Sequence, residues 1–226
     1  MGRIFNFDGP VFHFLEVFAN LVILNLLTIL LCIPVITGGA AITALHYSVL
    51  HMIRDTDNYI VRNFFKSFKE NFKRGTILWI PVLFFLAAIF LDAWLIRKNP
   101  NVFPPAAKIA FGVVFLLILF AIVWVFPLLC HFEYESTRSY IRNASLLAVG
   151  HLPRTAAMVV FTAAPLVFVY MQPYRSIVWL ILFGFSLPAW AKAWPYSPVF
   201  KAMEPPDKKE EGAEDGNGGE TEQSGT

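Results

Sequence analysis

The stretch "CIPVITGGAAITALHYSVLHMIRD", Cys32–Asp55, decides the topology of this chain. It follows a long apolar run, contains Pro34, and passes through six small residues before it becomes aromatic and then charged. Its last part, Gly38–Arg54, holds 17 residues, which make about 25 Å of helix at 1.5 Å per residue. That length is slightly short of a full bilayer crossing. The stretch therefore forms either a membrane span that packs closely against its neighbour or a re-entrant segment.

The composition of the chain is typical of a membrane protein with a polar C-terminal end. Of its 226 residues, 57% are hydrophobic and only 15% are charged, with a mean hydropathy of +0.58. Residues 204–226 hold eight acidic residues and two lysines, whereas the preceding 203 residues hold 16 Lys and Arg against 8 Asp and Glu. We therefore predict one transmembrane helical domain over residues 1–200 and a disordered acidic tail over residues 204–226.

Several apolar runs have membrane-spanning length. A span needs about 20 apolar residues, and backbone polar groups in hydrocarbon must be bonded internally, so we expect helices. The run at 155–191 is too long for one span and divides at the polar segment Gln172–Arg175. The predicted fold class is all-α, a polytopic helical membrane protein with five or six membrane helices plus short cytoplasmic amphipathic helices. The apolar helices are expected at about 11–33, 38–54, 76–97, 107–130, 155–170 and 176–191.

The basic residues between these runs predict the orientation. Eleven Lys and Arg lie in the segments 54–74, 138–154 and 192–201, and four lie in the opposite loops. The positive-inside rule places the first set in the cytoplasm. We therefore expect a multi-pass protein with a cytoplasmic C-terminus.

The opening stretch also supplies a face suited to close helix packing. Small residues recur there at helical spacing, namely Gly38, Gly39, Ala40, Thr43 and Ala44. Such faces let two membrane helices touch backbone to backbone. We expect residues 34–38 to form a turn and residues 11–33 to be the packing partner. A spanning hairpin gives six crossings with both termini inside, whereas a re-entrant segment gives five with the N-terminus outside.

A basic segment at residues 58–74 is patterned as an amphipathic helix that ends at Gly75. Phe64, Phe68 and Phe72 recur every four residues on one side. The opposite side carries a basic face formed by Arg62, Lys66, Lys69 and Lys73. Such a helix lies at the membrane surface, with its apolar side in the acyl boundary and its bases near anionic lipid. A docking surface for a cytoplasmic partner is the alternative. A second short helix is expected between Ser136 and Arg154.

Particular strings in the chain resemble a known family. "PVITGGA" (Pro34–Ala40), "TAL" (Thr43–Leu45) and "FFKSFKENFK" (Phe64–Lys73) are similar to the YesL-like bacterial membrane proteins, a domain of unknown function numbered 624. "RNASLLAVGHLPRT" (Arg142–Thr155) fits more weakly, and the resemblance covers roughly residues 5–195. It implies a bacterial cytoplasmic (plasma) membrane location and an accessory role beside carbohydrate uptake systems of the ABC type.

Few residues carry recognisable chemistry. Asn20, Asn25 and His46 are the polar residues that can line a cavity between spans, although asparagines in spans more often form hydrogen bonds between helices. Weaker candidates are His13 and Glu16 near a span end, Asp92 near another, and the cluster of His131, Glu133 and Glu135. No motif for a nucleotide-binding loop, a nucleophile or a metal is present. We therefore assign no catalytic, cofactor-binding or metal residues and expect no enzyme.

Three functions are compatible with these features of the sequence. The expected one is an accessory or regulatory partner of a carbohydrate ABC-type uptake system. The alternative is a small independent transporter with a polar cavity between its helices, and a membrane-embedded enzyme has the least support. The expected partners are the lipid bilayer and either ABC permease subunits or a homo-oligomer, with no nucleic acid and no cofactor.

Overall fold

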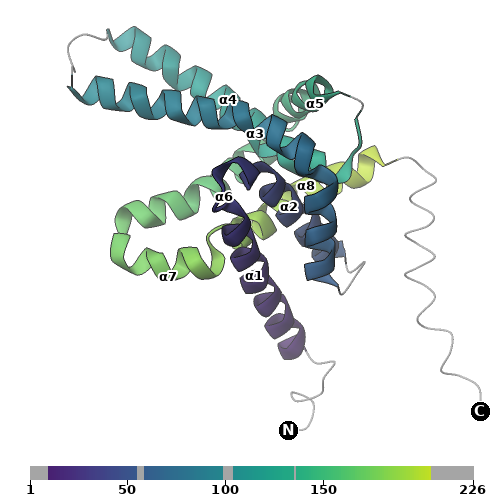
Figure 1. Ribbon diagram of the computed structural model, residues 1–226. Helices are drawn as coiled ribbons and strands as arrows, with labels where there is room; N and C mark the ends of the chain where they lie inside the picture. Colours follow the sequence, from purple (N-terminus) through teal and green to yellow (C-terminus); the bar gives the residue numbers. More distant parts are fainter. Residues whose placement is uncertain (1–9, 55–58, 99–103, 135, 205–226) are drawn as a thin grey trace, which may run out of the picture.

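The computed structural model describes residues 10–54, 59–98, 104–134 and 136–204 (Figure 1). The described residues form eight α-helices and one short 3-10 helix, and they contain no strand. The elements are α1 (Pro10–Cys32), η1 (Val35–Thr37), α2 (Gly38–Arg54), α3 (Ile60–Lys98), α4 (Pro105–His131), α5 (Thr137–Gly150), α6 (Leu152–Met171), α7 (Pro173–Phe183) and α8 (Ser186–Met203). The prediction of an all-α fold is confirmed.

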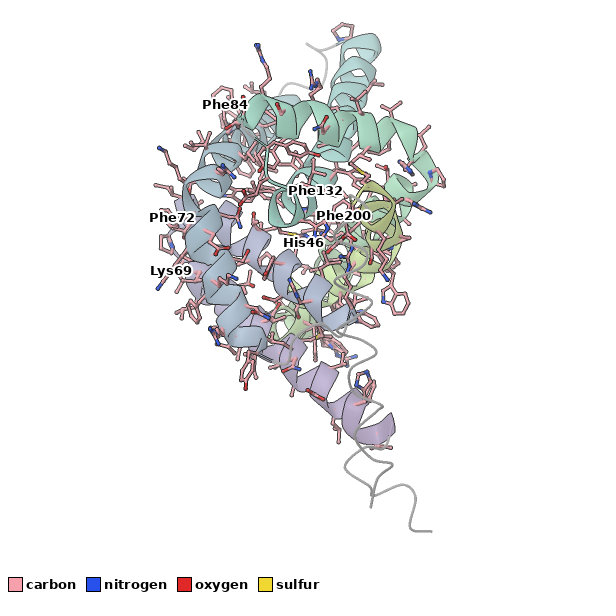
Figure 2. All side chains as sticks on the ribbon, turned by 90° about the vertical axis from the view of Figure 1, so that its right-hand side faces the viewer. His46, Lys69, Phe72, Phe84, Phe132 and Phe200 are labelled. Atoms are coloured by element: carbon pink, nitrogen blue, oxygen red, sulfur yellow. The ribbon has the colours of Figure 1, made fainter. Side chains whose placement is uncertain are left out.

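The central element is α2, which contacts α1, α3, α4 and α8. Leu45 and Val49 of α2 join Trp124 of α4 and Phe200 of α8 in one hydrophobic core. Figure 1 shows the α3–α4 pair and the α6–α7 pair extending to the same side of this centre. In Figure 2, His46 and Phe200 lie inside the bundle, whereas Phe84 lies at its outer surface.

Three helices in the described part of the chain are long and apolar enough to cross a membrane. They cover His13–Cys32, Val35–Arg54 and Leu152–Met171. A fourth candidate is the pair Tyr174–Phe183 and Ser186–Met203, which is bent by 57° at a short break. The second candidate span lies within the stretch Cys32–Asp55 discussed above. The protein is therefore a helical membrane protein with three or four candidate spans among the described residues.

Two predicted helix boundaries are wrong. Gly75 does not end a helix, because α3 runs without interruption from the amphipathic segment into the following apolar segment. The predicted helix at 176–191 is divided, since α7 ends at Phe183 and α8 begins at Ser186 and continues to Met203. Both differences arise from contacts with distant parts of the chain, which are described below.

The aromatic side of the amphipathic segment packs on protein. Phe64 is fully buried and Phe68 is partly buried against the core. Only Phe72 of the three remains largely exposed, at 43%. The expectation that this side faces the acyl boundary is therefore wrong for Phe64 and Phe68, because α3 uses them to pack against its neighbours, mainly α2.

Candidate functional site: polar and close backbone contacts around α2 and the α7–α8 break

The small residues of α2 lie against α3. Gly38, Gly39, Ala40, Thr43 and Ala44 are all buried. A Cβ on Gly39 would overlap the carbonyl oxygen of Gly75 and lie 2.6 Å from the Cβ of Trp79.

The contact is equally close when measured from α3. A Cβ on Gly75 would lie 2.9 Å from the Cα and the backbone nitrogen of Ala40. The expectation that residues 11–33 pair with this face is corrected for Gly39, which lies against α3, although α1 also contacts α2. The glycine of α3 supplies the second small residue that a backbone contact between helices requires.

The side chain of Asn25 from α1 forms hydrogen bonds to both sides of the break between α7 and α8. Its Nδ2 donates to the carbonyl oxygens of Leu180 (2.9 Å) and Ile181 (2.6 Å). Its Oδ1 accepts from the backbone N–H groups of Phe185 (2.7 Å) and Ser186 (3.1 Å). A primary amide has two donor hydrogens and one acceptor oxygen with two lone pairs. Asn25 therefore uses its full hydrogen-bonding capacity on backbone groups at the break, of which the Leu180 carbonyl also accepts from the Gly184 N–H.

His46 and Asn20 lie in different surroundings from Asn25. The ring of His46 is buried against Tyr196 of α8, with 3.4 Å between Nδ1 and the tyrosine hydroxyl and 5.9 Å between ring centroids. Asn20 is half-buried on α1. The three residues predicted to line a polar cavity are thus placed separately, and two of them contact protein groups.

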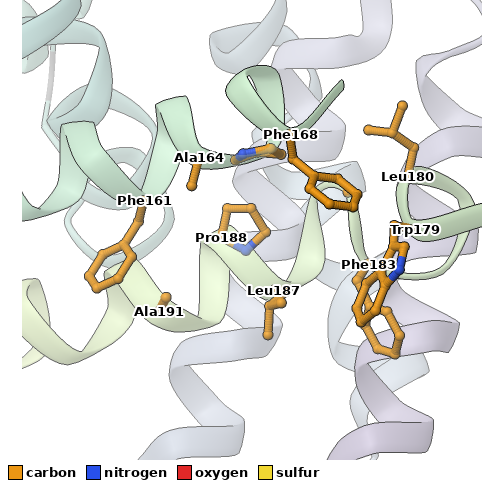
Figure 3. Close-up of a pocket in the computed structure, with 11 residues that line it drawn as sticks. Phe161, Ala164, Phe168, Trp179, Leu180, Phe183, Leu187, Pro188 and Ala191 are labelled. Carbon is orange, nitrogen blue, oxygen red and sulfur yellow. The ribbon is translucent and has the colours of Figure 1, made fainter. Parts of the chain in front are cut away.

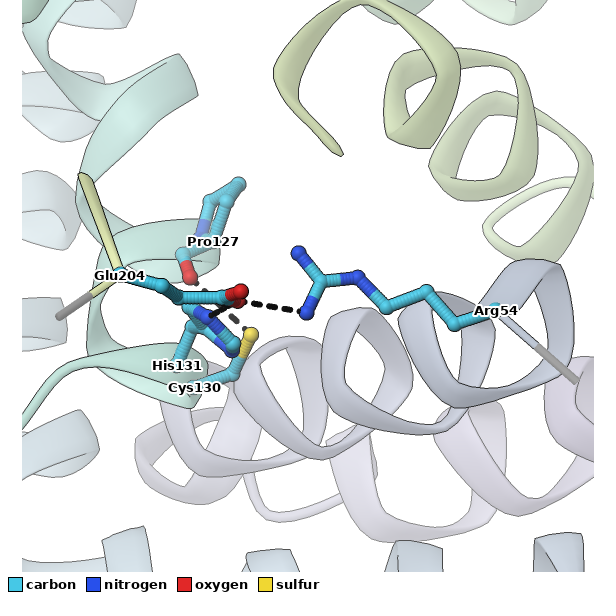
Figure 4. Close-up of polar contacts among 5 residues, drawn as sticks. All are labelled: Arg54, Pro127, Cys130, His131 and Glu204. Carbon is cyan, nitrogen blue, oxygen red and sulfur yellow. Dashed lines mark hydrogen bonds and ion pairs between the residues drawn. The ribbon is translucent and has the colours of Figure 1, made fainter. Parts of the chain in front are cut away.

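Three helix C-termini meet at a polar cluster (Figure 4). Arg54 ends α2, His131 ends α4, and Glu204 directly follows α8. Arg54 Nη1 donates to Glu204 Oε1 at 2.7 Å, and His131 Nε2 lies 2.6 Å from the same oxygen. The His131 ring also stacks on Phe200, with 5.3 Å between centroids and 3° between planes. The positive charge of Arg54 complements the partial negative charge of the C-terminus of α2.

The environment of the cluster determines its protonation. Burial and then the Arg54 charge lower the pKa of His131, more than the Glu204 carboxylate raises it. Burial alone raises the pKa of Glu204, but hydrogen bonds and charges from Arg54 and His131 hold it below its usual value. At neutral pH the imidazole is therefore uncharged and the carboxyl is ionised. Because a carboxylate only accepts hydrogen bonds, His131 Nε2 carries the hydrogen.

This cluster was missed by sequence reasoning. Glu204 was assigned to the disordered tail, yet it lies half-buried and bonded to residues 150 and 73 positions earlier. The remaining tail, residues 205–226, lies outside the described residues. Proximity to the last apolar helix was the only signal in the sequence, and it does not identify the two partners.

Most of the other candidate residues from the sequence are exposed to solvent or lipid. Arg62, Lys66, Lys69 and Lys73 are all exposed, and so are His13 and Glu16. Glu133 is exposed and takes no part in the His131 cluster, whereas Glu135 and the side chain of Asp92 lie outside the described residues. Within the described ranges, no three His, Cys, Asp or Glu side chains gather closely enough to hold a metal ion.

An apolar groove lies between α6, α7 and α8 (Figure 3). It has a volume of about 620 Å³. Its walls include Phe161, Phe168, Trp179, Phe183, Leu187 and Ala191, and none of its lining residues is charged. The groove contains none of the residues predicted to line a polar cavity.

Comparison with known proteins relates the chain to a family. A family model described as "Protein of unknown function, DUF624" matches residues 21–93. That region contains Asn25 and the close contact between Gly39 and Gly75. No solved structure matches the chain.

One curated protein is similar over about half of its length. The chain is 30% identical over 126 residues to "Uncharacterized protein YteU" of Bacillus subtilis (strain 168), and the alignment covers 54% of this chain and 55% of that protein. Over the matched regions, the chain is therefore similar to the DUF624 family of proteins of unknown function, and it spans about half the length of the curated relative.

Proposed function

We propose that the protein is an accessory or regulatory subunit of another membrane complex, specifically of a carbohydrate ABC-type uptake system in a bacterial cytoplasmic membrane. The uptake system comes from the family resemblance. The structure supports the accessory part of the proposal, because two of the three polar side chains predicted to line a transport pathway, Asn25 and His46, contact other helices. We propose no catalytic activity.

The bonding of Asn25 is the observation that carries this proposal. In transporters, broken helices present free backbone groups to a substrate or ion near the middle of the membrane. Here the break between α7 and α8 has the right form, but Asn25 bonds to Leu180, Ile181, Phe185 and Ser186. An intramembrane asparagine saturated in this way acts as a link between helices. An independent transporter with a polar cavity is therefore less favoured.

The polar cluster supports a common cytoplasmic side for several helix ends. Basic residues assign the ends of α2, α4 and α8 to the cytoplasm. Arg54, His131 and Glu204, one from each of these ends, meet within hydrogen-bonding distance. A shared location of the three ends is thus supported by two independent observations. We propose that the C-terminus is cytoplasmic.

A partner subunit would contact a surface that the fold leaves exposed. The small-residue face of α2 is already occupied by α3, so it is not available. From Ile77 onward, α3 leaves a stripe at helical spacing uncovered: Ile77, Ile80, Phe84 and Leu91, with Phe84 78% exposed. We place the subunit contact on this stripe.

The test is affinity purification of the tagged protein in a mild detergent from native membranes of cells grown on an inducing sugar. Mass spectrometry should identify ABC permease subunits at a stoichiometric level. The double variant Ile80→Ala with Phe84→Ala should lower their recovery. A matched control is Ile177→Ala with Val178→Ala on α7, which removes exposed apolar surface away from the stripe. This control should leave recovery unchanged.

Recovery of the protein alone, as a monomer or homo-oligomer, would contradict the accessory role. It would favour the transporter and direct attention to Asn20 and His46. If both double variants recovered permease subunits as well as the wild-type protein does, the accessory role would stand. The assignment of the subunit contact to the stripe on α3 would then be wrong.

A further inference from the structure

The groove between α6, α7 and α8 selects an apolar occupant. A polar or charged ligand finds no charged residue among its walls, and burying an unpaired polar group there would be costly. Its volume of about 620 Å³ falls within the range of small-molecule sites. Other surfaces of α6 and α7 are also apolar and exposed, including Val160 at 63% and Val178 at 61%. The helices that form the groove therefore present apolar side chains to hydrocarbon when they lie in a bilayer.

The bent helix pair gives the groove its shape. α7 and α8 meet at 57°, and both helices, together with Gly184 between them, contribute to the wall opposite α6. A Cβ on Gly184 would lie 2.7 Å from the Leu180 carbonyl oxygen, which marks how tightly the chain turns at this point. The Asn25 bonds to both sides of the break hold this bend, so the groove belongs to the folded bundle.

The shape of the walls favours a flexible chain over a helix. Membrane helices that bind one another use small residues along the whole contact, which let their backbones approach. Here small residues such as Ala164 and Ala191 alternate with large rings, and Phe168 and Trp179 form an edge-on pair with centroids 6.4 Å apart. Figure 3 shows these rings at one end of the groove and Phe161 at the other. Such rings hold a helical backbone away but leave room for a narrow hydrocarbon chain.

A positive charge lies beyond one end of the groove. Arg175 is exposed on α7, four residues before Trp179, and residues four apart share a helix face. Tyr170 and Tyr174, which are 87% and 90% exposed, lie near the same turn. Exposed tyrosines together with a basic residue at a helix end are typical of the layer where lipid headgroups lie. Arg175 and the apolar groove therefore follow one another as the phosphate and the acyl chain do in a phospholipid.

We propose that the groove binds an acyl chain of a phospholipid, with the lipid phosphate at Arg175. Phe161 and Ala191 line the end of the site farther from the headgroup, and Trp179 with Phe168 forms its entrance. This binding site is independent of the proposed accessory role, because a lipid can stabilise the α6–α8 region whether or not the protein joins a larger complex.

The test uses the full chain purified in mild detergent and measured by native mass spectrometry, both as isolated and after delipidation and titration with dioleoylphosphatidylglycerol. The wild-type protein should retain one phospholipid and rebind one. Ala191→Phe and Ala164→Phe fill the groove and should abolish this species. Val160→Phe places the same ring on the exposed side of α6 and should leave it intact. Arg175→Gln should weaken binding about fivefold, which corresponds to the ~1 kcal/mol that one base contributes near anionic lipid.

Thermal unfolding without lipid establishes that each variant is folded before its lipid content is compared. A folded Ala164→Phe or Ala191→Phe protein that still holds one lipid would overturn the proposal. So would a wild-type protein that neither retains nor rebinds lipid. If the wild-type protein instead migrated as a lipid-free dimer that Ala164→Phe converted to a monomer, the occupant would be a second copy of the chain.

Discussion

Replacement of Asn25 by Leu should destabilise the protein while the same replacement at Asn20 should not. Asn25→Leu keeps a side chain of similar size but removes all four hydrogen bonds at the α7–α8 break. The Leu180 carbonyl oxygen keeps one partner, since it also accepts from the Gly184 N–H at 3.0 Å. Ile181 would lose its side-chain donor, and the N–H groups of Phe185 and Ser186 would lose their acceptor.

Two independent scales give the expected magnitude. An unsatisfied buried polar group costs about 1–3 kcal/mol, and three such groups at the low end cost about 3 kcal/mol. Hydrogen bonds inside membrane proteins average about 0.6 kcal/mol each, so four contribute about 2.4 kcal/mol. We therefore expect the Asn25 variant to lose about 2–3 kcal/mol of unfolding free energy.

Unfolding in mixed micelles, followed by circular dichroism as the fraction of sodium dodecyl sulfate is raised, measures this difference. Asn20 is half-buried on the same helix, and its replacement by Leu should change the unfolding free energy by less than about 0.5 kcal/mol. If both variants unfolded at the wild-type midpoint, the hydrogen bonds of Asn25 would not stabilise the α7–α8 break. The argument against a transport role for Asn25 would then fail as well.

Four further outcomes are expected. Gly39→Ala should cost about 1–3 kcal/mol, because its Cβ forces α2 away from the backbone of α3; thermal unfolding in detergent measures this, and an unchanged midpoint would contradict the contact. Because the pKa of His131 is lowered in the folded protein, the unfolded chain binds more protons at this residue, and stability should fall as the pH drops below about 6.5. The variant His131→Gln keeps an N–H donor and should flatten this decline. The lowered pKa of Glu204 should add a second loss at more acidic pH, below about 4.3, that Glu204→Gln removes; a wild-type profile in both variants would refute the assignment. Cys32 is half-buried and Cys130 is buried. A maleimide should therefore label Cys32 first in the native protein and both cysteines after denaturation. Equal labelling rates in the native protein would contradict the burial of Cys130 at the end of α4.

The spans were predictable because their signal is local. Long apolar runs determine helices in hydrocarbon, and the small residues Gly39 and Thr43 lie on a packing face that is visible from their spacing. The choice of partner was not predictable in this way. Gly75 looked like a helix end, but a glycine costs a helix only about 1 kcal/mol, and here it allows the approach of Ala40.

The polar features depend on contacts that local sequence does not encode. Gly184 and Pro188 are residues that can interrupt a helix, but nothing in the local sequence shows that the groups at the break are bonded by Asn25, 160 residues away from Phe185. Glu204 lies at the edge of an acidic segment, and its composition assigned it to the tail. Its buried role depends on Arg54 and His131, which reach it only after α2, α4 and α8 have assembled.

The bond between Asn25 and the α7–α8 break also has a consequence for biosynthesis. During synthesis α1 emerges first and enters the membrane without its partner, whereas α7 and α8 follow last. Exposed backbone groups are unfavourable in lipid, and the Ile181 carbonyl and the N–H groups of Phe185 and Ser186 gain their side-chain partner only when α1 packs against the break. The 57° bend should therefore become stable late, when an early and a late segment of the chain come together.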